Sequence, residues 1–351
     1  MLTIQSDHNT RMILESDPAE VWIVAFHPDG KHFFDGTRHE IRRWRVADGQ
    51  ELRKQTDSET TYAISVSKDE RWLVCGTTSG ASVWDAELRE KVITVESGKH
   101  VFSVDVAPDC TKFATGTTGH KATIWSITTG RKLIGPLEHG GDVNGVKFSP
   151  DGGRLATACY GDPTIRIFDA HNGDQLITIE NPIPINSFLP IVWSTHGQRL
   201  FAVSEDYKIK SFDSPTGSPL AEWQIHGNSD GPMSVALSAN GKFIASSAGC
   251  CVSFWDTSTL AQLGIVEDSN GIHCIALSPD DCRLATGSID SGKTIIWDLS
   301  SILPGSYLSY NVSTALLKST MTFIHKPLFL YARKLLAPDR KWSHFESITV
   351  Q

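Results

Sequence analysis

The sequence predicts an all-β fold: a seven-bladed β-propeller of four-stranded antiparallel blades, followed by a short helical C-terminal extension. The first observation is an aromatic residue that ends a short apolar segment seven times, at intervals of 40 to 44 residues: Trp44, Trp84, Trp125, Phe168, Phe212, Trp255 and Trp297. The second is a turn such as Pro28-Asp29-Gly30, which recurs in step with these aromatics. A fixed period of this size, filled by short strand-like segments, is typical of a propeller.

The clearest repeat, residues 142–179, shows how each blade is expected to form. Pro150-Asp151-Gly152 makes the first turn, in which proline presets φ and glycine accepts a positive φ. The third strand, residues 164–168, is rich in β-branched residues. The four expected strands cover residues 143–148, 155–158, 164–168 and 175–179. Because one such sheet cannot bury both faces alone, we expect the repeats to stack radially.

The ring is expected to close through the start of the chain. The last repeat reaches Trp297-Asp298 and then lacks a good fourth strand, whereas residues 11–15 read as a strand just before Val21. We therefore expect residues 11–15 to complete blade seven and to cover its open edge. The expected domains are an N-terminal lead (1–10), the propeller (11–301) and a basic, apolar C-terminal tail (302–351).

The pairs Trp84-Asp85, Trp255-Asp256 and Trp297-Asp298 resemble the name-giving motif of the WD-repeat (tryptophan–aspartate repeat) β-propeller family. Phe168-Asp169 and Phe212-Asp213 are softened versions, while the aspartate is lost after Trp44 and Trp125. The resemblance covers roughly residues 11–300. It implies a propeller and says little about function, because function depends on the sites that a fold carries.

Members of this family often hold each blade with a buried His–Ser/Thr–Trp–Asp hydrogen-bond network. The resemblance implies that blade four keeps His139, Thr157 and Asp162 but has Phe168 in place of the tryptophan. Blade seven keeps Thr286, Asp290 and Trp297 without a matching histidine. We interpret these residues as structural bonds rather than as a catalytic triad, because buried polar groups need partners.

The resemblance also points to the residue after the first apolar anchor of each blade, which in the family tends to lie near the top rim and to meet partners. These residues are Trp22, Tyr62, Phe102, Asn144, Leu189, Met233 and His273, and neighbouring turn positions add Arg38, His39, His120, Tyr160, Glu205 and Tyr207. Large aromatics are typical anchors of binding sites. Two interpretations stay open: an exposed binding crescent, or ordinary packing between blades. An error of one residue in the expected strand register would move these side chains to the opposite face and so exchange the two interpretations.

Two further clusters of residues could form sites. Arg38, Arg42, Arg43 and Arg45 either bind an acidic partner or phosphate, or form a solvated edge balanced by nearby acids. Cys250-Cys251 could be a redox or metal-binding pair, but no second Cys or His cluster at metal spacing lies nearby in the sequence. There is no P-loop, dinucleotide fingerprint or nucleophile elbow. We therefore expect no catalytic residue, no metal site and no cofactor.

Composition limits the class of protein. The chain has 351 residues, 40% of them hydrophobic and 21% charged, with a net charge of −8. The acidic balance argues against nucleic-acid binding. We expect no signal peptide and no membrane span. Seven scattered cysteines suit a reducing compartment, so the expected location is cytoplasmic, with the nucleus left open.

The tail carries a charge opposite to that of the propeller. Residues 303–351 contain six basic residues against Asp339 and Glu346: Lys318, Lys326, Arg333, Lys334, Arg340 and Lys341. Residues 314–324 and 328–337 read as two short helices separated at Pro327. Docking on the acidic propeller, a partner-binding arm and a membrane-surface helix all remain open.

These observations favour a non-enzymatic interaction scaffold, a monomeric propeller that assembles a multiprotein complex by binding protein or peptide partners at its rim. A hydrolase or lyase with a site in the central channel is one alternative. A regulatory sensor that partners a signalling NTPase is the other.

Overall fold

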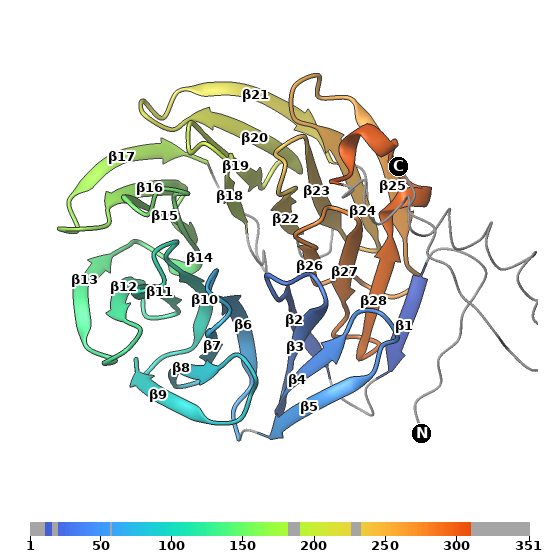
Figure 1. Ribbon diagram of the computed structural model, residues 1–351. Coiled ribbons are helices and arrows are strands. Elements are labelled where there is room, and N and C mark those ends of the chain that lie inside the picture. Colours follow the sequence, from blue (N-terminus) through green and yellow to red (C-terminus); the bar gives the residue numbers. More distant parts are fainter. Residues whose placement is uncertain (1–10, 16–19, 57, 182–189, 226–232, 310–351) are drawn as a thin grey trace, which may run out of the picture. The chain divides into compact units, whose positions relative to one another are not determined.

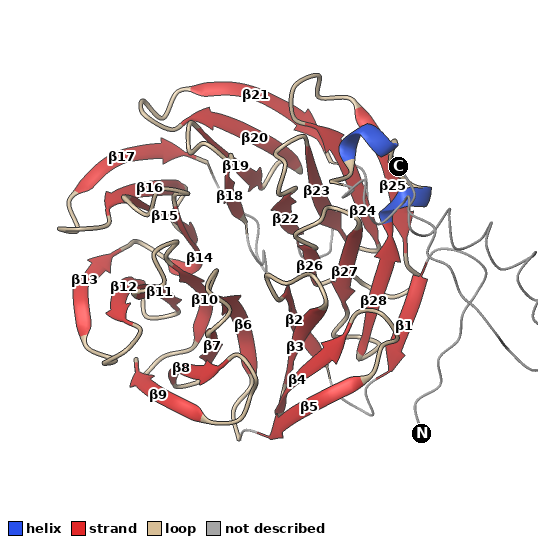
Figure 2. Ribbon diagram, in the orientation of Figure 1, coloured by secondary structure: helices blue, strands red, loops and turns tan. Residues whose placement is uncertain are grey.

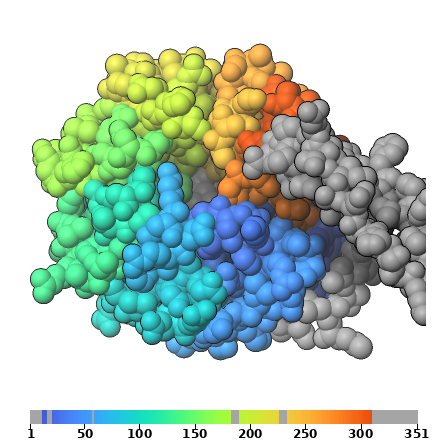
Figure 3. Space-filling view, in the orientation of Figure 1, coloured from blue at the N-terminus to red at the C-terminus, as the bar shows by residue number. Residues whose placement is uncertain are grey.

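A computed structural model describes residues 11–15, 20–56, 58–181, 190–225 and 233–309. Seven four-stranded antiparallel sheets follow one another around a ring, as the sequence predicts (Figures 1 and 2). The space-filling view shows the blades packed side by side around a hollow near the middle of one face (Figure 3). No helix among these residues is long and apolar enough to cross a membrane.

The blades follow the sequence repeats. Blade one consists of β2 (Val21–Phe26), β3 (His32–Thr37), β4 (Glu40–Arg45) and β5 (Glu51–Thr56); blade two of β6 (Thr61–Val66), β7 (Trp72–Thr77), β8 (Gly80–Asp85) and β9 (Lys91–Glu96); blade three of β10 (Val101–Val106), β11 (Lys112–Thr117), β12 (Lys121–Ser126) and β13 (Lys132–Glu138). Blade four consists of β14 (Asp142–Phe148), β15 (Arg154–Tyr160), β16 (Thr164–Asp169) and β17 (Gln175–Glu180).

Blade five consists of β18 (Ile191–Trp193), β19 (Arg199–Ser204), β20 (Lys208–Asp213) and β21 (Pro219–Gln224); blade six of β22 (Met233–Leu237), β23 (Phe243–Ala248), β24 (Cys251–Asp256) and β25 (Gln262–Glu267); blade seven of β26 (Cys274–Leu277), β27 (Arg283–Gly287), β28 (Lys293–Asp298) and β1 (Arg11–Glu15). The 3-10 turns η1 (Leu299–Ser301) and η2 (Gly305–Tyr307) follow.

The two ends of the ring are joined in blade seven. Residues 11–15, the segment expected there, form β1 and pair antiparallel with β28, from Arg11 opposite Trp297 to Glu15 opposite Lys293 (Figure 1). The Lys293 ammonium lies 3.0 Å from the Glu15 carboxylate. The outer edge of the third strand, β28, is therefore covered by a strand from the other end of the sequence.

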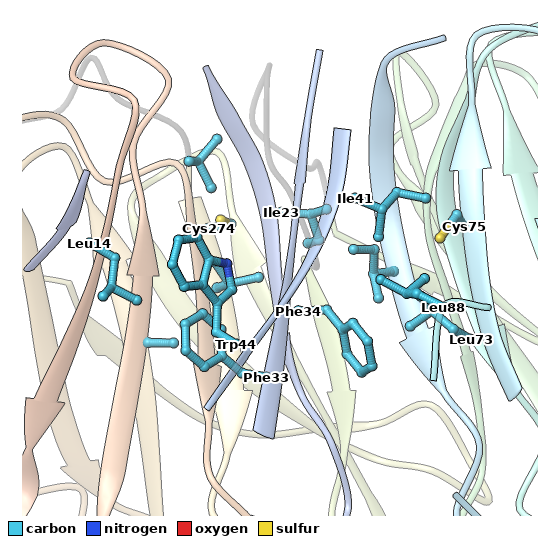
Figure 4. Packing of buried hydrophobic residues seen from close by; sticks show 14 of the residues in the cluster. Leu14, Ile23, Phe33, Phe34, Ile41, Trp44, Leu73, Cys75, Leu88 and Cys274 are labelled. Atoms are coloured by element: carbon cyan, nitrogen blue, oxygen red, sulfur yellow. The ribbon is translucent and has the colours of Figure 1, made fainter. Parts of the chain in front are cut away.

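Blade one shows how a blade fills both of its faces. Successive residues of a strand point to opposite faces, so Phe33 and Phe34 face different neighbours (Figure 4). Phe33 stacks on Trp44 with ring centroids 6.2 Å apart and lies toward Leu14 of blade seven. Phe34 lies toward Leu73 and Leu88 of blade two. These residues belong to one buried hydrophobic cluster that spans three blades.

A buried ion pair joins blade one to blade seven. Arg42 (3% exposed) donates from Nε and Nη2 to the two oxygens of Asp35 (0% exposed), at 2.8 and 3.0 Å. Thr294 of β28 donates its hydroxyl to Asp35 Oδ2 at 3.1 Å. The buried Arg43 reaches Glu87 of blade two at 2.6 Å. The expectation of a solvated arginine edge is thus wrong for Arg42 and Arg43, whose charges are neutralised by specific carboxylates.

The first residues assigned to the tail pack on the propeller. The Tyr307 hydroxyl donates to Asp256 of blade six at 2.6 Å, and the Ser309 hydroxyl donates to Asp281 of blade seven at 2.8 Å. Leu303 and Leu308 are buried in a cluster formed with both blades. Residues 302–309 thus continue the propeller, whereas the helices expected at 314–324 and 328–337 lie outside the described residues.

Replacing Asp35 by alanine is expected to lower the free energy of unfolding by about 3–5 kcal/mol, because it leaves a buried arginine without its partner. Asp48→Ala breaks the exposed Arg45–Asp48 pair and should cost at most about 1 kcal/mol. Asp35→Leu combined with Arg42→Leu should recover part of the loss, because no charge stays unpaired. Chemical denaturation measures all three, and a loss in Asp35→Ala no larger than in Asp48→Ala would refute this role.

Candidate functional site

A β-bulge at the start of three consecutive blades directs three aromatic side chains to one end of the ring. In blade one Val21 pairs with Thr37 and Ile23 with Gly36, so Trp22 is the extra residue. Tyr62 and Phe102 occupy the same bulged position in blades two and three. A bulge re-aims the side chain that it inserts. Without it, a residue at this point would follow the inward and outward alternation of the strand.

The three aromatics form one continuous cluster across the blade boundaries. The Trp22 and Tyr62 rings meet edge to face with centroids 5.2 Å apart, and Tyr62 meets Phe102 in the same way at 5.0 Å. Edge-to-face contact is a favoured geometry for aromatic rings. The exposed His100 stacks on Tyr62 at 5.7 Å. All three aromatics remain half-buried, so they contact one another and still present surface to solvent.

Most of the other expected rim residues reach solvent at the same end of the blades. The β3–β4 turn is formed by Arg38 and His39, and 63% of the Arg38 side chain is exposed. Trp22 lies beside this turn, because β2 starts opposite the end of β3. Tyr160 is exposed at the end of β15, and Tyr207 is half-buried in the β19–β20 turn. Tyr207 lies in blade five, away from the three aromatics in the order of the ring.

Met233 does not lie at the rim, where the sequence pattern predicts it. It is 0% exposed and packs in the core between blades five and six. It pairs with Ala248 as Val21 pairs with Thr37, because β22 lacks the extra bulge residue. The sequence alignment of blade six was therefore one residue out of step.

The remaining aligned positions differ among themselves. His273 pairs through its backbone N–H with the Gly287 carbonyl, just before Cys274, and is half-buried. Asn144 occupies the bulge of blade four but is buried. Leu189 lies outside the described residues.

The polar network of blade four is a set of structural bonds. His139 Nδ1 lies 2.8 Å from the Leu137 carbonyl, and its Nε2 lies 2.8 Å from the Thr157 hydroxyl. Asp162 accepts from the Gly140 N–H at 3.0 Å and from the Thr164 hydroxyl at 2.7 Å. Burial lowers the pKa of His139 to about 4. The imidazole is therefore neutral at pH 7, with both nitrogens engaged.

Tryptophan–hydroxyl pairs recur in other blades. The indole N–H of Trp297 donates to the Thr286 hydroxyl at 3.1 Å, as the resemblance implied. Asp290, expected in the same network, interacts electrostatically with His273. Burial lowers the pKa of His273, and the negative charge of Asp290 opposes this shift. The same indole donation links Trp84 to Ser82, Trp125 to Thr115 and Trp255 to Ser246.

Trp44 departs from this pattern. Its indole nitrogen has no hydrogen-bond partner within the described part of the chain, and the Arg42 guanidinium lies 5.3 Å from its ring centroid.

One group that could hold a metal ion was missed by the sequence reasoning. His27, Asp29 and His32 converge at the first turn of blade one, the end of β2 opposite the aromatic cluster. In the sequence this turn reads as an ordinary Pro-Asp-Gly turn, and the only available signal was a histidine on each side of it.

Comparison with known proteins agrees with this geometry. Residues 131–169, 217–256 and 262–298 match the family model "WD domain, G-beta repeat". Three of the seven blades thus match WD repeats, and the fold is a seven-bladed β-propeller. The Swd1 β-propeller domain of Myceliophteria thermophila superposes with a TM-score of 0.71, covering 86% of this chain and 100% of that one, at 17% identity. That likeness concerns the fold alone.

Curated relatives are similar to this chain over part of their length. Eukaryotic translation initiation factor 3 subunit I of Scheffersomyces stipitis is 27% identical over 63% of this chain and 66% of its own. The guanine nucleotide-binding protein subunit beta of Nicotiana plumbaginifolia is 31% identical over 56% of each chain. The WD repeat-containing protein 26 homolog of Arabidopsis thaliana is 26% identical over 86% of this chain and 54% of its own. The chain thus spans between about half and two thirds of these relatives.

Stability should depend on pH through His139. Its pKa is about 4 in the folded protein and 6.5 in the unfolded chain, so the unfolded state binds more protons between these values. The free energy of unfolding should therefore fall by about 2–3 kcal/mol as the pH drops from 6.5 to 4. His139→Gln should remove this component, and His171→Gln, at an exposed histidine, should keep it. Urea denaturation at several pH values tests this, and an unchanged profile in His139→Gln would contradict it.

Proposed function

We propose that this protein is a non-enzymatic interaction scaffold that binds protein or peptide partners at its rim and so helps to assemble a multiprotein complex. One observation carries the proposal: Trp22, Tyr62 and Phe102 form a continuous, half-exposed aromatic cluster across three blades. Aromatic residues dominate the energetic centre of protein interfaces. Three such side chains from separate repeats offer one extended surface to a partner.

The cluster is rigid before any partner arrives. Each aromatic residue occupies the bulge of a hydrogen-bonded strand, and each side chain contacts the aromatic side chain of a neighbouring blade. Binding to a preorganised surface loses less conformational entropy than binding to a mobile loop. The propeller thus increases affinity by fixing the positions of the three aromatic side chains before a partner binds.

Polar groups surround the apolar cluster. Arg38 lies 3.9 Å from Glu20 beside Trp22, and the exposed His120 lies 3.3 Å from Asp142 at the next blade boundary after Phe102. An apolar centre with a polar margin is the usual composition of a protein interface. This arrangement supports a protein or peptide partner over a small molecule, which would favour an enclosed cavity.

The relatives give the scaffold proposal independent support. Two of them are named as subunits, one of a translation initiation factor and one of a guanine nucleotide-binding protein. The second name favours one further candidate function, a regulatory partner of a nucleotide-binding signalling protein. The enzyme alternative gains no similar support from these names. Among the described histidines, His139 has a pKa lowered to about 4, but both of its ring nitrogens are held in structural bonds.

We also propose that the protein acts in the cytoplasm as a single propeller within its complex. All seven cysteines are free, although Cys250 and Cys251 have sulfur atoms only 3.7 Å apart. A chain with this many unpaired thiols suits a reducing compartment.

Replacing the aromatic anchors is expected to release the partner while keeping the fold. Trp22→Ala and Phe102→Ala should each weaken partner binding by at least about 30-fold, because removing an interface hot spot typically costs 2 kcal/mol or more. Affinity purification with quantitative mass spectrometry identifies the proteins that the native chain retains. Calorimetry on the purified pair then measures the change in affinity.

Trp72→Ala is the matched control. Trp72 is also half-buried, but it begins β7 at the opposite end of the blade. It should retain the same partners, and thermal unfolding should show that all three variants are folded. Equal binding by the Trp22, Phe102 and Trp72 variants would exclude the aromatic cluster as the binding surface.

A further inference from the structure

We propose that His27, Asp29 and His32 form a binding site for a divalent transition-metal ion of the zinc class. The three residues lie at the first turn of blade one, at the opposite end of the ring from the aromatic cluster. The site is therefore separate from the proposed partner surface and does not depend on it.

The ligand atoms already converge. His27 Nδ1 lies 3.1 Å from Asp29 Oδ1, and His32 Nδ1 lies 2.6 Å from Asp29 Oδ2. Each of the three residues offers an atom within 4.8 Å of the others. Ligands at about 2.0–2.1 Å from a tetrahedral zinc ion are roughly 3.3 Å apart. The site therefore needs side-chain shifts of about 1 Å to accept the ion.

Blade one differs here from the other blades. At the position of His27, blades two, four and seven have Ser67, Ser149 and Ser278, whose hydroxyls lie 2.5 Å from the aspartate of their own turns. His32 occupies the position of Trp72, Arg154 and Arg283, as the pairing with the third strand shows. Of the three residues, only the aspartate is thus shared with the turns of these other blades. Two imidazoles around it occur in blade one only, among the described blades.

The turn backbone holds the ligands in place. The Gly30 N–H donates to the His27 carbonyl and the His27 N–H donates to the His32 carbonyl, both at 3.0 Å. Asp29 Oδ1 accepts from the backbone N–H groups of Lys31 and His32, at 2.7 and 3.1 Å. Such hydrogen bonds to a carboxylate keep it oriented. Metal binding would replace the hydrogen bond from the Asp29 N–H to His27 Nδ1 (3.3 Å) and the one between His32 Nδ1 and Asp29 Oδ2 (2.6 Å), while the other backbone hydrogen bonds of the turn stay in place.

Burial and charge also suit a metal ion. His27 is buried, whereas Asp29 and His32 are half-buried, which leaves a route to solvent. The site thus presents a carboxylate and two imidazoles, ligands that favour zinc, copper or nickel over calcium or magnesium. Three protein ligands leave one position for water or a partner's side chain.

The test uses the full chain without an affinity tag, stripped with a chelator and titrated with Zn²⁺ by calorimetry and with Co²⁺ by visible absorption. One saturable ion per chain is expected. His27→Ser and His32→Arg should each weaken binding by about tenfold or more. Both substitutions install residues that other blades carry at these positions, so the fold should be retained. His120→Gln, at a histidine with a single carboxylate neighbour, should bind like the native chain.

A second measurement does not depend on the variants. Nuclear magnetic resonance of the imidazole nitrogens in the native chain should show the signals of two histidines shifting on addition of one equivalent of Zn²⁺. The His27→Ser and His32→Arg spectra assign these signals. The proposal is overturned if no saturable binding occurs, if both variants bind as tightly as the native chain, or if the signals that shift belong to other histidines.

Discussion

The pairing of β1 with β28 is the constraint on which the rest of the structure depends. It brings together residues 11–15 and 293–297, the two ends of the propeller sequence. Each blade buries its faces against its neighbours, so a ring with one gap would expose apolar faces and a strand edge. Closure also places Thr294 against Asp35, where blade seven meets blade one. The hydrogen bond between Thr294 and Asp35, which are far apart in the sequence, thereby becomes part of the core.

Within the closed ring, one inserted residue at the start of blades one, two and three brings a side chain out of the core and to the rim. The bulge places Trp22, Tyr62 and Phe102 at the rim, and their spacing is set by the packing of blades one to three. Blade six shows the opposite case. Its first strand has no bulge, and Met233 therefore follows the strand alternation into the core. The bulge is not sufficient by itself, because Asn144 occupies the bulge of blade four and is buried.

This contrast explains how much the sequence could predict. Blade number, strand order and closure depend on local patterns that repeat, so they could be predicted before any coordinates. The fate of Arg42 and Arg43 could not, because their partners Asp35 and Glu87 are brought close by strand pairing and blade packing. Met233 was misplaced because a one-residue bulge leaves the apolar pattern almost unchanged. The end of the repeat pattern places residues 302–309 in the tail, yet Tyr307 and Ser309 bond to carboxylates of two blades.

The candidate sites arise where a blade departs from the repeat. Blade four has Asn144 at the bulge where blades one to three have aromatics, and blades two, four and seven have serine where blade one has His27. Packing alone explains the shared residues, because they fill the same core positions in every blade. It does not explain three aromatics that touch across blade boundaries and stay half-exposed, or two imidazoles around one carboxylate. Residues that break a local rule without an evident gain in stability are those for which function is the better explanation. Trp22 lies near the start of β2 and His27 directly follows its end, so the proposed partner surface and the proposed metal site are at opposite ends of one strand and do not overlap.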